Sequence, residues 1–533
     1  MGKDKDKAEK RQPINVEPPS GTRDFFPEDM RFRNWLFEKM RYVGKIYGFQ
    51  EYDAPVLEHD ELFKRKQGEE ITEQMYCFTD KEGAHVTLRP EMTPSFARMV
   101  LSLMRAETGE MAALLPLKWF SIPQCWRFET TQRGRKREHY QWNMDIVGIP
   151  GIQAEVEILS AAVMLFESVG LTAKEIVIRV NSRKLLATLL KKAGVPDDKF
   201  ASTCVIVDKL DKMPAEEVIK ELNEKEGLAK EVGATIVKAT SAKTIAEFAE
   251  IANVGKEDTE ELQRLFDLAD EYGFGDWLQF DASVVRGLAY YTGVVFEGVD
   301  RGGVIKTMVG GGRYDKLLSL FGSPKEVPCA GFGFGDIRLY EVLKEYGKLP
   351  ELSAEVEFVV AAYSSDMFGK ALAVARKLRL AGKTVDVYPD QAKKVAKAFN
   401  FADRVGAKKI AFVAPDEYSR GLVRIKDLRS FTADTPDEEK QKDVPLDDLA
   451  NVDAYFGGKA ATTGDSATAS SSKGGEFEAL LQDQPYIGGF RPSAEDCSTF
   501  EKLRGSSGKP KSAAMARWYE HMESFTQAER SSW

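Results

Sequence analysis

Two stretches on either side of a basic loop alternate polar and apolar side chains, and this pattern constrains the fold most strongly. Successive side chains of a strand point to opposite faces, so residues 124–129 and 140–147 each predict a strand with one polar face. Joined as an antiparallel hairpin, the strands merge these faces into one floor. The floor carries Arg127, Glu129, Gln141 and Asp145. Such a face can simply be solvated, but the basic loop 130–137 at its tip favours a nucleotide or nucleic-acid site.

Glycine-rich segments later in the chain place further arginines where phosphate can approach. They are residues 286–291 (RGLAYY), 310–315 (GGGRYD) and 331–338 (GFGFGDIR). A guanidinium is a planar, permanently charged fork that grips phosphoryl oxygens two at a time. The small–large alternation in 331–335 predicts a strand that turns into a helix carrying Arg338. The full G-x-G-x-x-G spacing with a later acidic residue is missing, which argues against a dinucleotide-binding fold.

Length and composition exclude several classes of protein. A chain of 533 residues is too long for one core, so we expect two to four domains. The sequence contains no run of about 18 apolar residues, the length that would predict a membrane-spanning helix. Five scattered cysteines without a Cys-x-x-Cys pair predict a reducing compartment and no zinc site. Residues 1–11 mix both charge signs without an apolar region, so we expect a flexible tail, no targeting peptide and a cytoplasmic protein.

Hydrophobic periodicity outlines the elements. Residues 28–47 predict an amphipathic helix, and 49–58 predict a strand that Pro55 restricts to an edge or interface position. Residues 185–275 are helix-rich. From 354 to 456, strands and helices alternate, which predicts a βαβ-type unit with a parallel or mixed sheet.

Charge and composition change again towards the end of the chain. The net charge of −9 argues against a protein that wraps nucleic acid over its whole surface. Residues 391–430, however, contain ten Lys and Arg and only four acidic residues, so this segment is locally basic. Residues 457–475 are rich in Gly, Ser, Thr and Ala and predict a flexible linker. The aromatic-rich residues 476–533 after it predict an appended module.

These segments, in this order, resemble the motifs of histidyl-tRNA synthetases, which are class II aminoacyl-tRNA synthetases. The resemblance covers roughly residues 20–456. It implies an α+β class II core, with an antiparallel sheet flanked by helices and a helical insertion, followed by an α/β anticodon-binding domain and a small all-α module. The helix and strand over 28–58 resemble motif 1, which in this family builds the homodimer interface. Two alternatives remain: a non-catalytic regulatory or sensor paralogue, and a scaffold acting through the C-terminal module.

The resemblance implies a reaction and assigns residues to ATP and tRNA. The enzyme would activate L-histidine with ATP to histidyl-adenylate and pyrophosphate, with Mg²⁺ bridging the ATP phosphates, and transfer histidine to the 3′ end of its tRNA. Arg127 and Glu129 stand where motif 2 binds ATP, and Arg338 where motif 3 meets the γ-phosphate. Arg286 matches an arginine near the α-phosphate, where other class II enzymes use a metal ion. The four widely spaced histidines add no metal cluster, so no protein-bound metal is expected. The loop residues implied to approach the tRNA acceptor end are Arg133, Arg135 and Arg137.

The resemblance also assigns the histidine pocket. Glu91 and Thr93, in a segment LRPEMT, would bind the α-amino group together with Gln141. Asp145 and Tyr291 would bind the imidazole ring, with Tyr314 as a further pocket tyrosine. Three positions depart from the family pattern: Met92 replaces a glycine, Ala289 an aspartate and Ile337 a glutamate.

The predicted domains follow from both arguments. They are a tail over 1–19, a catalytic core over 20–345 with an insertion at about 190–275, an anticodon-binding domain over 354–456, a linker over 457–475 and a helical module over 476–533. The last module resembles the glutathione-transferase-C-like domain of the elongation factor 1 beta subunit. That resemblance implies a translation-factor or multi-synthetase partner.

Overall fold

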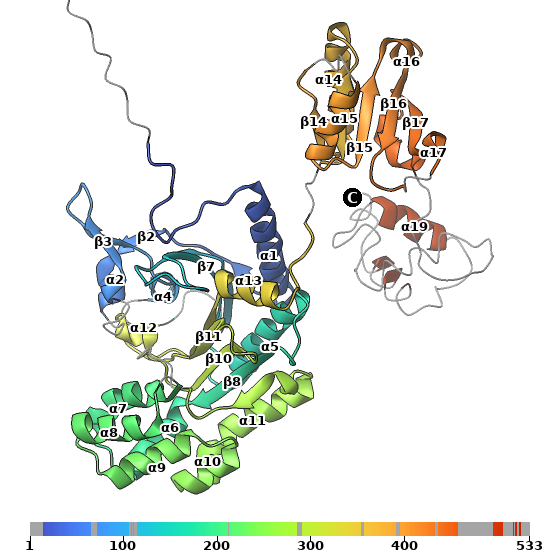
Figure 1. The fold of residues 1–533 in the computed structure, drawn as a ribbon. Helices are drawn as coiled ribbons and strands as arrows, with labels where there is room; N and C mark the ends of the chain where they lie inside the picture. Colours follow the sequence, from blue (N-terminus) through green and yellow to red (C-terminus); the bar gives the residue numbers. More distant parts are fainter. Residues whose placement is uncertain are drawn as a thin grey trace, which may run out of the picture. The chain divides into compact units, whose positions relative to one another are not determined.

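The chain folds into two compact units, Met1–Ser353 and Ala354–Trp533 (Figure 1). The computed structural model describes residues 14–65, 72–105, 108, 110, 115–211, 213–284, 290–352, 356–390, 395–431, 435–456, 494–504, 515, 518–519 and 522–523. No helix within these ranges has the length and apolar character needed to cross a membrane.

A large mixed sheet forms the centre of the first unit. Its described strands run in the order β1-β5-β7-β12-β11-β10-β8-β9, and β6 pairs with β7 beside this row. They are β1 (Gln50–Glu51), β5 (Leu117–Ser121), β6 (Gln124–Trp126), β7 (Glu138–Val147), β8 (Ile176–Ser182), β9 (Leu278–Phe280), β10 (Val294–Asp300), β11 (Val309–Arg313) and β12 (Cys329–Gly335). Neighbours are antiparallel except for β1 with β5 and β8 with β9. The sheet has the predicted class II character.

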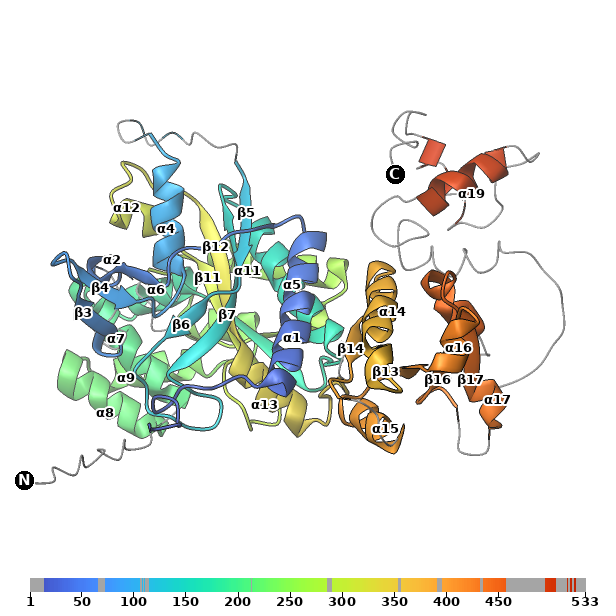
Figure 2. The same cartoon turned by 90° about the horizontal axis from the view of Figure 1, so that it is seen from above.

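Helices flank this sheet. They are α1 (Pro27–Ile46), α2 (Asp60–Lys64), α4 (Thr93–Ser102), α5 (Gln153–Ser168), α12 (Leu317–Leu320) and α13 (Asp336–Glu345). The predicted helix 28–47 is confirmed as α1, and its apolar stripe buries Leu36, Met40 and Val43. That stripe packs in one core with α5 and with Trp142 and Met144 of β7. Figure 2 shows α1 and α5 side by side over the sheet.

The predicted single strand over 49–58 is wrong. It is two short strands in different sheets: β1 lies at the edge of the large sheet, and β2 (Leu57–His59) joins a small sheet. The other strands of that small sheet are β3 (Tyr76–Thr79) and β4 (His85–Leu88). Pro55 lies between the two strands, where its missing N–H and fixed φ angle suit a change of direction better than continued pairing.

The glycine alternation in β12 has a steric cause. A Cβ atom on Gly331 would overlap the carboxylate of Asp145, and one on Gly333 would overlap the amide of Gln141. Both of those side chains come from β7, which pairs antiparallel with β12. The alternating residues Phe332 and Phe334 point to the other face and enter the core. Glycine therefore leaves the room that the polar side chains of β7 occupy.

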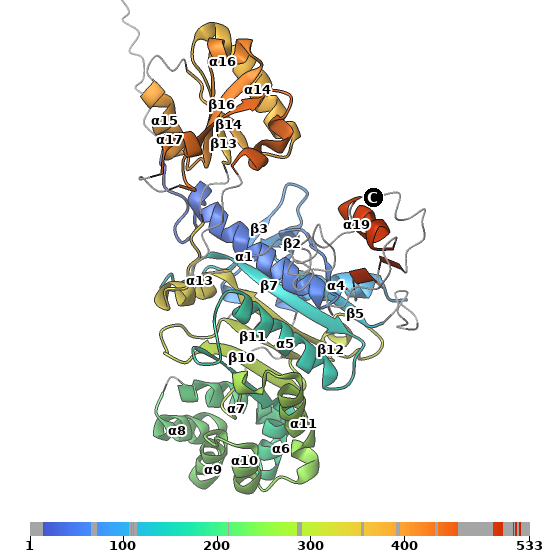
Figure 3. The same cartoon turned by 90° about the vertical axis from the view of Figure 1, so that its right-hand side faces the viewer.

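A helical segment connects β8 to β9, in the region predicted to be helix-rich. Its helices are α6 (Arg183–Lys192), α7 (Phe200–Val207), α8 (Ala215–Glu226), α9 (Lys230–Thr240), α10 (Ile245–Ala252) and α11 (Lys256–Tyr272). Figure 3 shows α7 to α10 gathered at the end of the unit away from α1. Buried Leu222, Ile236 and Phe248 give this segment an apolar interior that is continuous with the main core.

The second unit contains the predicted mixed sheet, in the order β14-β13-β15-β16-β17. The strands are β13 (Phe358–Ala362), β14 (Val385–Val387), β15 (Lys409–Val413), β16 (Leu422–Asp427) and β17 (Gln441–Pro445); the helices are α14 (Phe368–Leu380), α15 (Val395–Arg404), α16 (Pro415–Ser419), α17 (Asp437–Lys440) and α19 (Ala494–Arg504). Strand β13 is parallel to both β14 and β15, as a βαβ unit requires. The predicted linker 457–475 lies outside the described residues.

Candidate active site

A cavity of about 390 Å³ lies beside the central strands of the large sheet. Residues that the sequence assigned to ATP, histidine or tRNA line much of it: Glu91, Thr93, Arg127, Glu129, Arg135, Gln141, Asp145, Tyr291, Tyr314 and Arg338. These residues are separated by up to about 250 positions in the chain, and the fold of the first unit brings them together. Arg286 lies outside the described residues, as does Ala289.

Asp145 forms the floor of the cavity. The residue is 1% exposed, and its Oδ1 accepts a hydrogen bond from the phenol of Tyr314. Its Oδ2 has no hydrogen-bond partner among the described residues. Burial raises the pKa of Asp145 to about 7; the Tyr314 hydrogen bond lowers it and the nearby charge of Glu91 raises it. This carboxylate therefore keeps one buried acceptor available for a ligand with an N–H group.

The start of α4 and the residues just before it contribute Thr93 and Glu91. Thr93 is the first residue of the helix, and Met92 takes φ −96° and ψ −28°, an ordinary conformation for any residue. The glycine that Met92 replaces is therefore not needed for the backbone here. The buried Arg89 supports the segment by donating to the carbonyls of Ala54 and Gln124, at 2.6 and 3.0 Å. The sequence analysis gave Arg89 no role.

Arg127 and Glu129 do not lie in a strand, because β6 ends at Trp126. That part of the predicted hairpin is wrong, although β6 pairs antiparallel with β7 as predicted. Both side chains still line the cavity. Arg127 Nε donates to the carbonyl of Pro90 at 2.9 Å, and Arg135 Nη1 lies 3.4 Å from Glu129 Oε2. Two guanidinium groups around one carboxylate form a site suited to a polyphosphate with a divalent cation.

Arg338 enters the cavity from the first turn of α13. The predicted turn from strand to helix is confirmed, since β12 ends at Gly335 and α13 begins at Asp336. Arg338 Nη1 donates to the carbonyl of Thr307. Ile337, which replaces the glutamate of the family pattern, also lines the cavity and is 9% exposed.

The other two loop arginines are engaged elsewhere. Arg133 pairs with Glu341 and Glu345 of α13, at 2.9 and 2.7 Å. The guanidinium of Arg137 lies 3.8 Å from the ring centroid of Phe128. Neither side chain lines the cavity, so only Arg135 of the three joins the site in this structure.

His139 is a cavity residue that the sequence analysis missed. It lies on β7, two residues before Gln141, so the period of two that selected Gln141 and Asp145 also selects His139. Burial lowers the pKa of His139 to about 3, and the neighbouring charge of Arg127 lowers it further. The ring is therefore neutral at physiological pH. Other cavity residues without a predicted role include Gln74, Tyr290 and Thr307.

Among the described residues, no group of three or more His, Cys, Asp or Glu side chains could hold a metal ion.

Family models match both units. A model described as Histidyl-tRNA synthetase matches residues 21–336, and one described as Anticodon binding domain matches residues 357–452. Together these matches cover the strands of all three sheets and every described residue that lines the cavity except Ile337 and Arg338.

Individual proteins and structures agree with these models. The chain is 48% identical to the histidine–tRNA ligase, chloroplastic/mitochondrial, of Arabidopsis thaliana over 417 residues, 78% of this chain and 84% of the relative. It is 34% identical to the histidine–tRNA ligase of Pyrococcus furiosus over 443 residues, 81% and 98% of the two chains. The crystal structure of histidyl-tRNA synthetase from Nostoc sp. PCC 7120 has the same fold, with a TM-score of 0.67, 24% identity, and coverage of 83% and 99%. The matches support a catalytic histidine–tRNA ligase over a non-catalytic paralogue, and the chain belongs to the histidyl-tRNA synthetase family of class II aminoacyl-tRNA synthetases.

Proposed function

We propose that the cavity beside β7 and β12 is where this ligase joins histidine to ATP. The observation that carries the proposal is the division of the cavity into two chemically different parts. Asp145, Tyr291 and Tyr314 form a buried aromatic and acidic part, and Arg127, Arg135 and Arg338 supply positive charge to the rest. The first part suits an imidazole ring and the second a triphosphate.

In this proposal the ATP phosphates lie among the three arginines. A carboxylate oxygen of histidine attacks the α-phosphorus, the bond from that phosphorus to the bridging oxygen breaks, and pyrophosphate leaves with the electron pair. Arg127 and Arg286 stabilise the negative charge that develops on the α-phosphoryl oxygens, and Arg338 holds the γ-phosphate. No side-chain nucleophile is required, because positioning and electrostatics supply the catalysis.

The neutral ring of His139 is suited to stack on adenine. It lies beside Arg127 in the same cavity, and its pKa of about 3 leaves the ring neutral at physiological pH. A flat, uncharged ring contacts any base by stacking without the cost of removing an ion from water.

Glu129 is the cavity carboxylate placed to contribute to Mg²⁺ binding. It lies between Arg127 and Arg135, with N–O distances of 3.9 and 3.4 Å, so it is already among the groups that would face the phosphates. When bound there, with Glu129 as its protein ligand, Mg²⁺ would neutralise part of the phosphate charge. Arg127 and Arg135 would hold the same phosphates from the protein side.

Histidine would be held at both ends. Glu91, Thr93 and Gln141 would receive its α-ammonium group, since a carboxylate, a hydroxyl and an amide oxygen all accept hydrogen bonds. Asp145 and Tyr291 would contact the imidazole. A buried carboxylate with an available oxygen selects a side chain that donates a hydrogen bond, and it disfavours apolar side chains of similar size because they would leave that oxygen unpaired.

The activated histidine would pass to the terminal ribose of its tRNA. The loop with Arg133, Arg135 and Arg137 is the candidate contact with the acceptor end, and the second unit is the candidate contact with the anticodon. Contacts of basic side chains to phosphate would make tRNA binding weaken as the salt concentration rises.

We further propose a homodimer built on the region of α1 and β2. Large apolar side chains in this region are exposed: Tyr42 by 46%, Ile46 by 49%, Val56 by 39% and Leu57 by 43%. A second copy of the chain covering them would remove this apolar surface from water. Analytical ultracentrifugation of the purified protein tests the proposal, and Ile46→Glu with Leu57→Glu should shift the dimer to monomer.

The C-terminal module would bind a translation factor or another synthetase, as its glutathione-transferase-C-like resemblance implies. Its described residues include a buried hydrogen bond from Trp518 Nε1 to Asp496 Oδ1 at 2.9 Å, and Phe500 packs on Tyr519. Deletion of 457–533 should leave aminoacylation in vitro intact and abolish binding of that partner. If the protein acts mainly as a scaffold, the same deletion should abolish its main function.

We also propose that the protein is located in the cytoplasm. The name of the Arabidopsis thaliana relative specifies chloroplasts and mitochondria, which makes an organelle the competing location. A fluorescent protein fused to the C-terminus of this chain distinguishes the two, because it leaves the N-terminus available to any import machinery.

The proposed chemistry is tested by separating histidine binding from adenylate formation. In Arg286→Ala, histidine-dependent ATP–pyrophosphate exchange should fall by about 100-fold or more, as expected when a group that stabilises the transition-state charge is lost. Histidine binding measured by calorimetry should remain. Unchanged exchange would exclude the role given to Arg286.

A further inference from the structure

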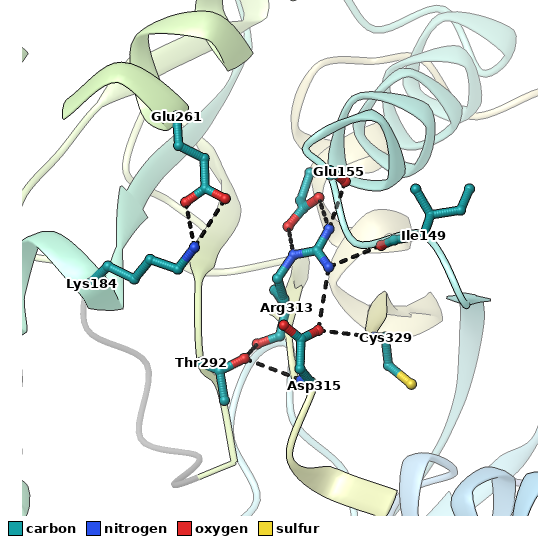
Figure 4. Close-up of polar contacts among 9 residues, drawn as sticks. Ile149, Glu155, Lys184, Glu261, Thr292, Arg313, Asp315 and Cys329 are labelled. Atoms are coloured by element: carbon teal, nitrogen blue, oxygen red, sulfur yellow. Dashed lines mark hydrogen bonds and ion pairs between the residues drawn. The ribbon is translucent and has the colours of Figure 1, made fainter. Parts of the chain in front are cut away.

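A buried ion pair lies behind the tyrosines of the cavity. Arg313, the last residue of β11, is 2% exposed, and Glu155, in the first turn of α5, is completely buried. Arg313 Nε and Nη2 donate to the two oxygens of Glu155, both at 2.6 Å. Figure 4 shows the two side chains facing each other. Neither residue lines the cavity, and the proposed chemistry gives neither a role.

Every N–H group of this guanidinium has an acceptor. Beyond the two bonds to Glu155, Arg313 donates to the carbonyls of Ile149 and Gly151, at 3.0 and 2.8 Å, and to Asp315 Oδ1 at 3.3 Å. A guanidinium has five N–H donors in a fixed planar arrangement, so a fully used set holds its orientation firmly. Lysine, with three donors on one nitrogen, cannot reproduce this arrangement.

The backbone around Arg313 joins two segments that both lead to the cavity. The carbonyl of Arg313 accepts a hydrogen bond from the N–H of Thr292 at 2.8 Å, and Thr292 Oγ1 accepts one from the N–H of Asp315 at 3.1 Å. Tyr314 follows Arg313 directly, and Tyr291 precedes Thr292 directly. The ring of Tyr290 contacts both tyrosines, with centroid distances of 4.9 Å to Tyr291 and 5.9 Å to Tyr314.

We propose that Arg313 is a positioning residue for histidine: held by Glu155, it fixes the backbone of Tyr314 directly and that of Tyr291 through Thr292. The inference rests on the proposed function of the cavity, because it assumes that these tyrosines contact histidine. It assigns to the ion pair an effect on substrate geometry in addition to packing. A displacement of about 1 Å at a substrate-binding group can change a rate on the order of 100-fold, so small movements of this backbone are measurable.

Two conservative substitutions test this role. Glu155→Gln keeps the size of the side chain but removes its charge, and Thr292→Val keeps the shape but removes the hydroxyl. Both should raise the KM for histidine, Glu155→Gln by about 10-fold or more, while the KM for ATP stays within about twofold. Thr292→Ser, which restores the hydroxyl, should restore most of the affinity for histidine. The matched control is Glu157→Gln on the same helix, which breaks the ion pair to Lys118 and should change neither KM.

The KM values separate positioning from a purely structural role. If Glu155→Gln and Thr292→Val only lower the melting temperature or the fraction of active enzyme, both KM values stay unchanged and the proposal is overturned. Equal increases in both KM values would overturn it as well. Tyr314→Phe is measured in parallel: a raised histidine KM in that variant alone overturns only the role of Arg313. An unchanged histidine KM in Tyr314→Phe overturns the assignment of the pocket and the proposal with it.

Discussion

The phenol of Tyr314 donates a hydrogen bond to Asp145 Oδ1, while Asp145 Oδ2 faces no partner among the described residues. One side of the carboxylate is thus fixed by the protein, and the other is available to a ligand. This geometry makes the protonation state of Asp145 decisive, because only an ionised or correctly oriented carboxyl group accepts an N–H from substrate.

The first prediction concerns the pH dependence of histidine binding. The ordinary pKa of an aspartate is 3.8, and burial raises that of Asp145 to about 7 in the free protein. Below that pH the carboxyl is increasingly protonated, and the imidazole of free histidine, with a pKa of about 6.5, is protonated too. Protonation of Asp145 alone should therefore raise the KM for histidine by up to about tenfold per pH unit below pH 6, protonation of the substrate should add to this rise, and the KM should level off above pH 8.

Asp145→Asn is the control for that pH profile. The amide cannot ionise, so the KM for histidine should be about 10- to 100-fold higher at pH 8, and its remaining change with pH should be only the part that protonation of the substrate causes. A wild-type KM for histidine that does not change between pH 5.5 and 8 would contradict the role of Asp145.

The second prediction concerns His139. If its neutral ring stacks on adenine, His139→Phe should keep the KM for ATP within a few fold, because the stacking surface is retained. His139→Ala should raise it by about 10-fold, since stacking of one base on one ring contributes about 1–3 kcal/mol. Pyrophosphate exchange at varied ATP concentration provides both values. Equal effects of the two substitutions would show that the ring does not stack on the nucleotide.

The third prediction uses two glycines of neighbouring strands. A Cβ atom on Gly333 would displace the flexible end of Gln141. One on Gly311 would overlap the backbone carbonyl of Gly331, the ring of Phe296 and the Cβ atom of Phe332. Gly333→Ala should therefore raise the KM for histidine with little change in stability. Gly311→Ala should lower the free energy of unfolding by about 1–3 kcal/mol, the usual cost of overpacking a core. Denaturant unfolding and pyrophosphate-exchange kinetics on both variants test this prediction. A stability loss in Gly333→Ala and a raised KM without such a loss in Gly311→Ala would contradict it.

The fourth prediction concerns Arg133. Its ion pairs with Glu341 and Glu345 must break before it can contact tRNA, and exposed ion pairs contribute about 0–1 kcal/mol. The double substitution Glu341→Gln and Glu345→Gln should therefore lower the KM for tRNA by up to about fivefold without changing pyrophosphate exchange. The double variant of the exposed Glu326 and Glu351 to Gln has the same net charge and should have a smaller effect. If both double variants lower the KM for tRNA equally, the change in net charge explains the effect and the role of the Arg133 ion pairs is contradicted.

The period-two pattern of strand residues correctly placed two of the cavity residues of β7 on one face. Asp145 and Gln141 line the cavity because β7 buries one face in the core and turns the other to the site, and a period of two records that arrangement directly. The same rule would have selected His139 had the strand been started at Glu138 instead of Tyr140. His139 was therefore missed because the first residue of the strand was predicted two positions too late.

The buried arginines could not be predicted, for a different reason. Arg313 lies in a glycine-rich segment much like that of Arg286, yet its partner is Glu155, 158 positions away. A guanidinium binds phosphate and carboxylate with the same geometry, so the local sequence does not distinguish the two. The division of 49–58 into two strands likewise depends on pairing with β5 and β4, which lie far away in the sequence.

The most direct test of the account is amino-acid-dependent ATP–pyrophosphate exchange, measured on the purified protein with each of the twenty amino acids. The account predicts exchange with histidine alone, and a large loss of it in Asp145→Asn and Tyr291→Phe. Exchange with a different amino acid would contradict the assignment of the pocket, and no exchange with any of them would contradict the catalytic function.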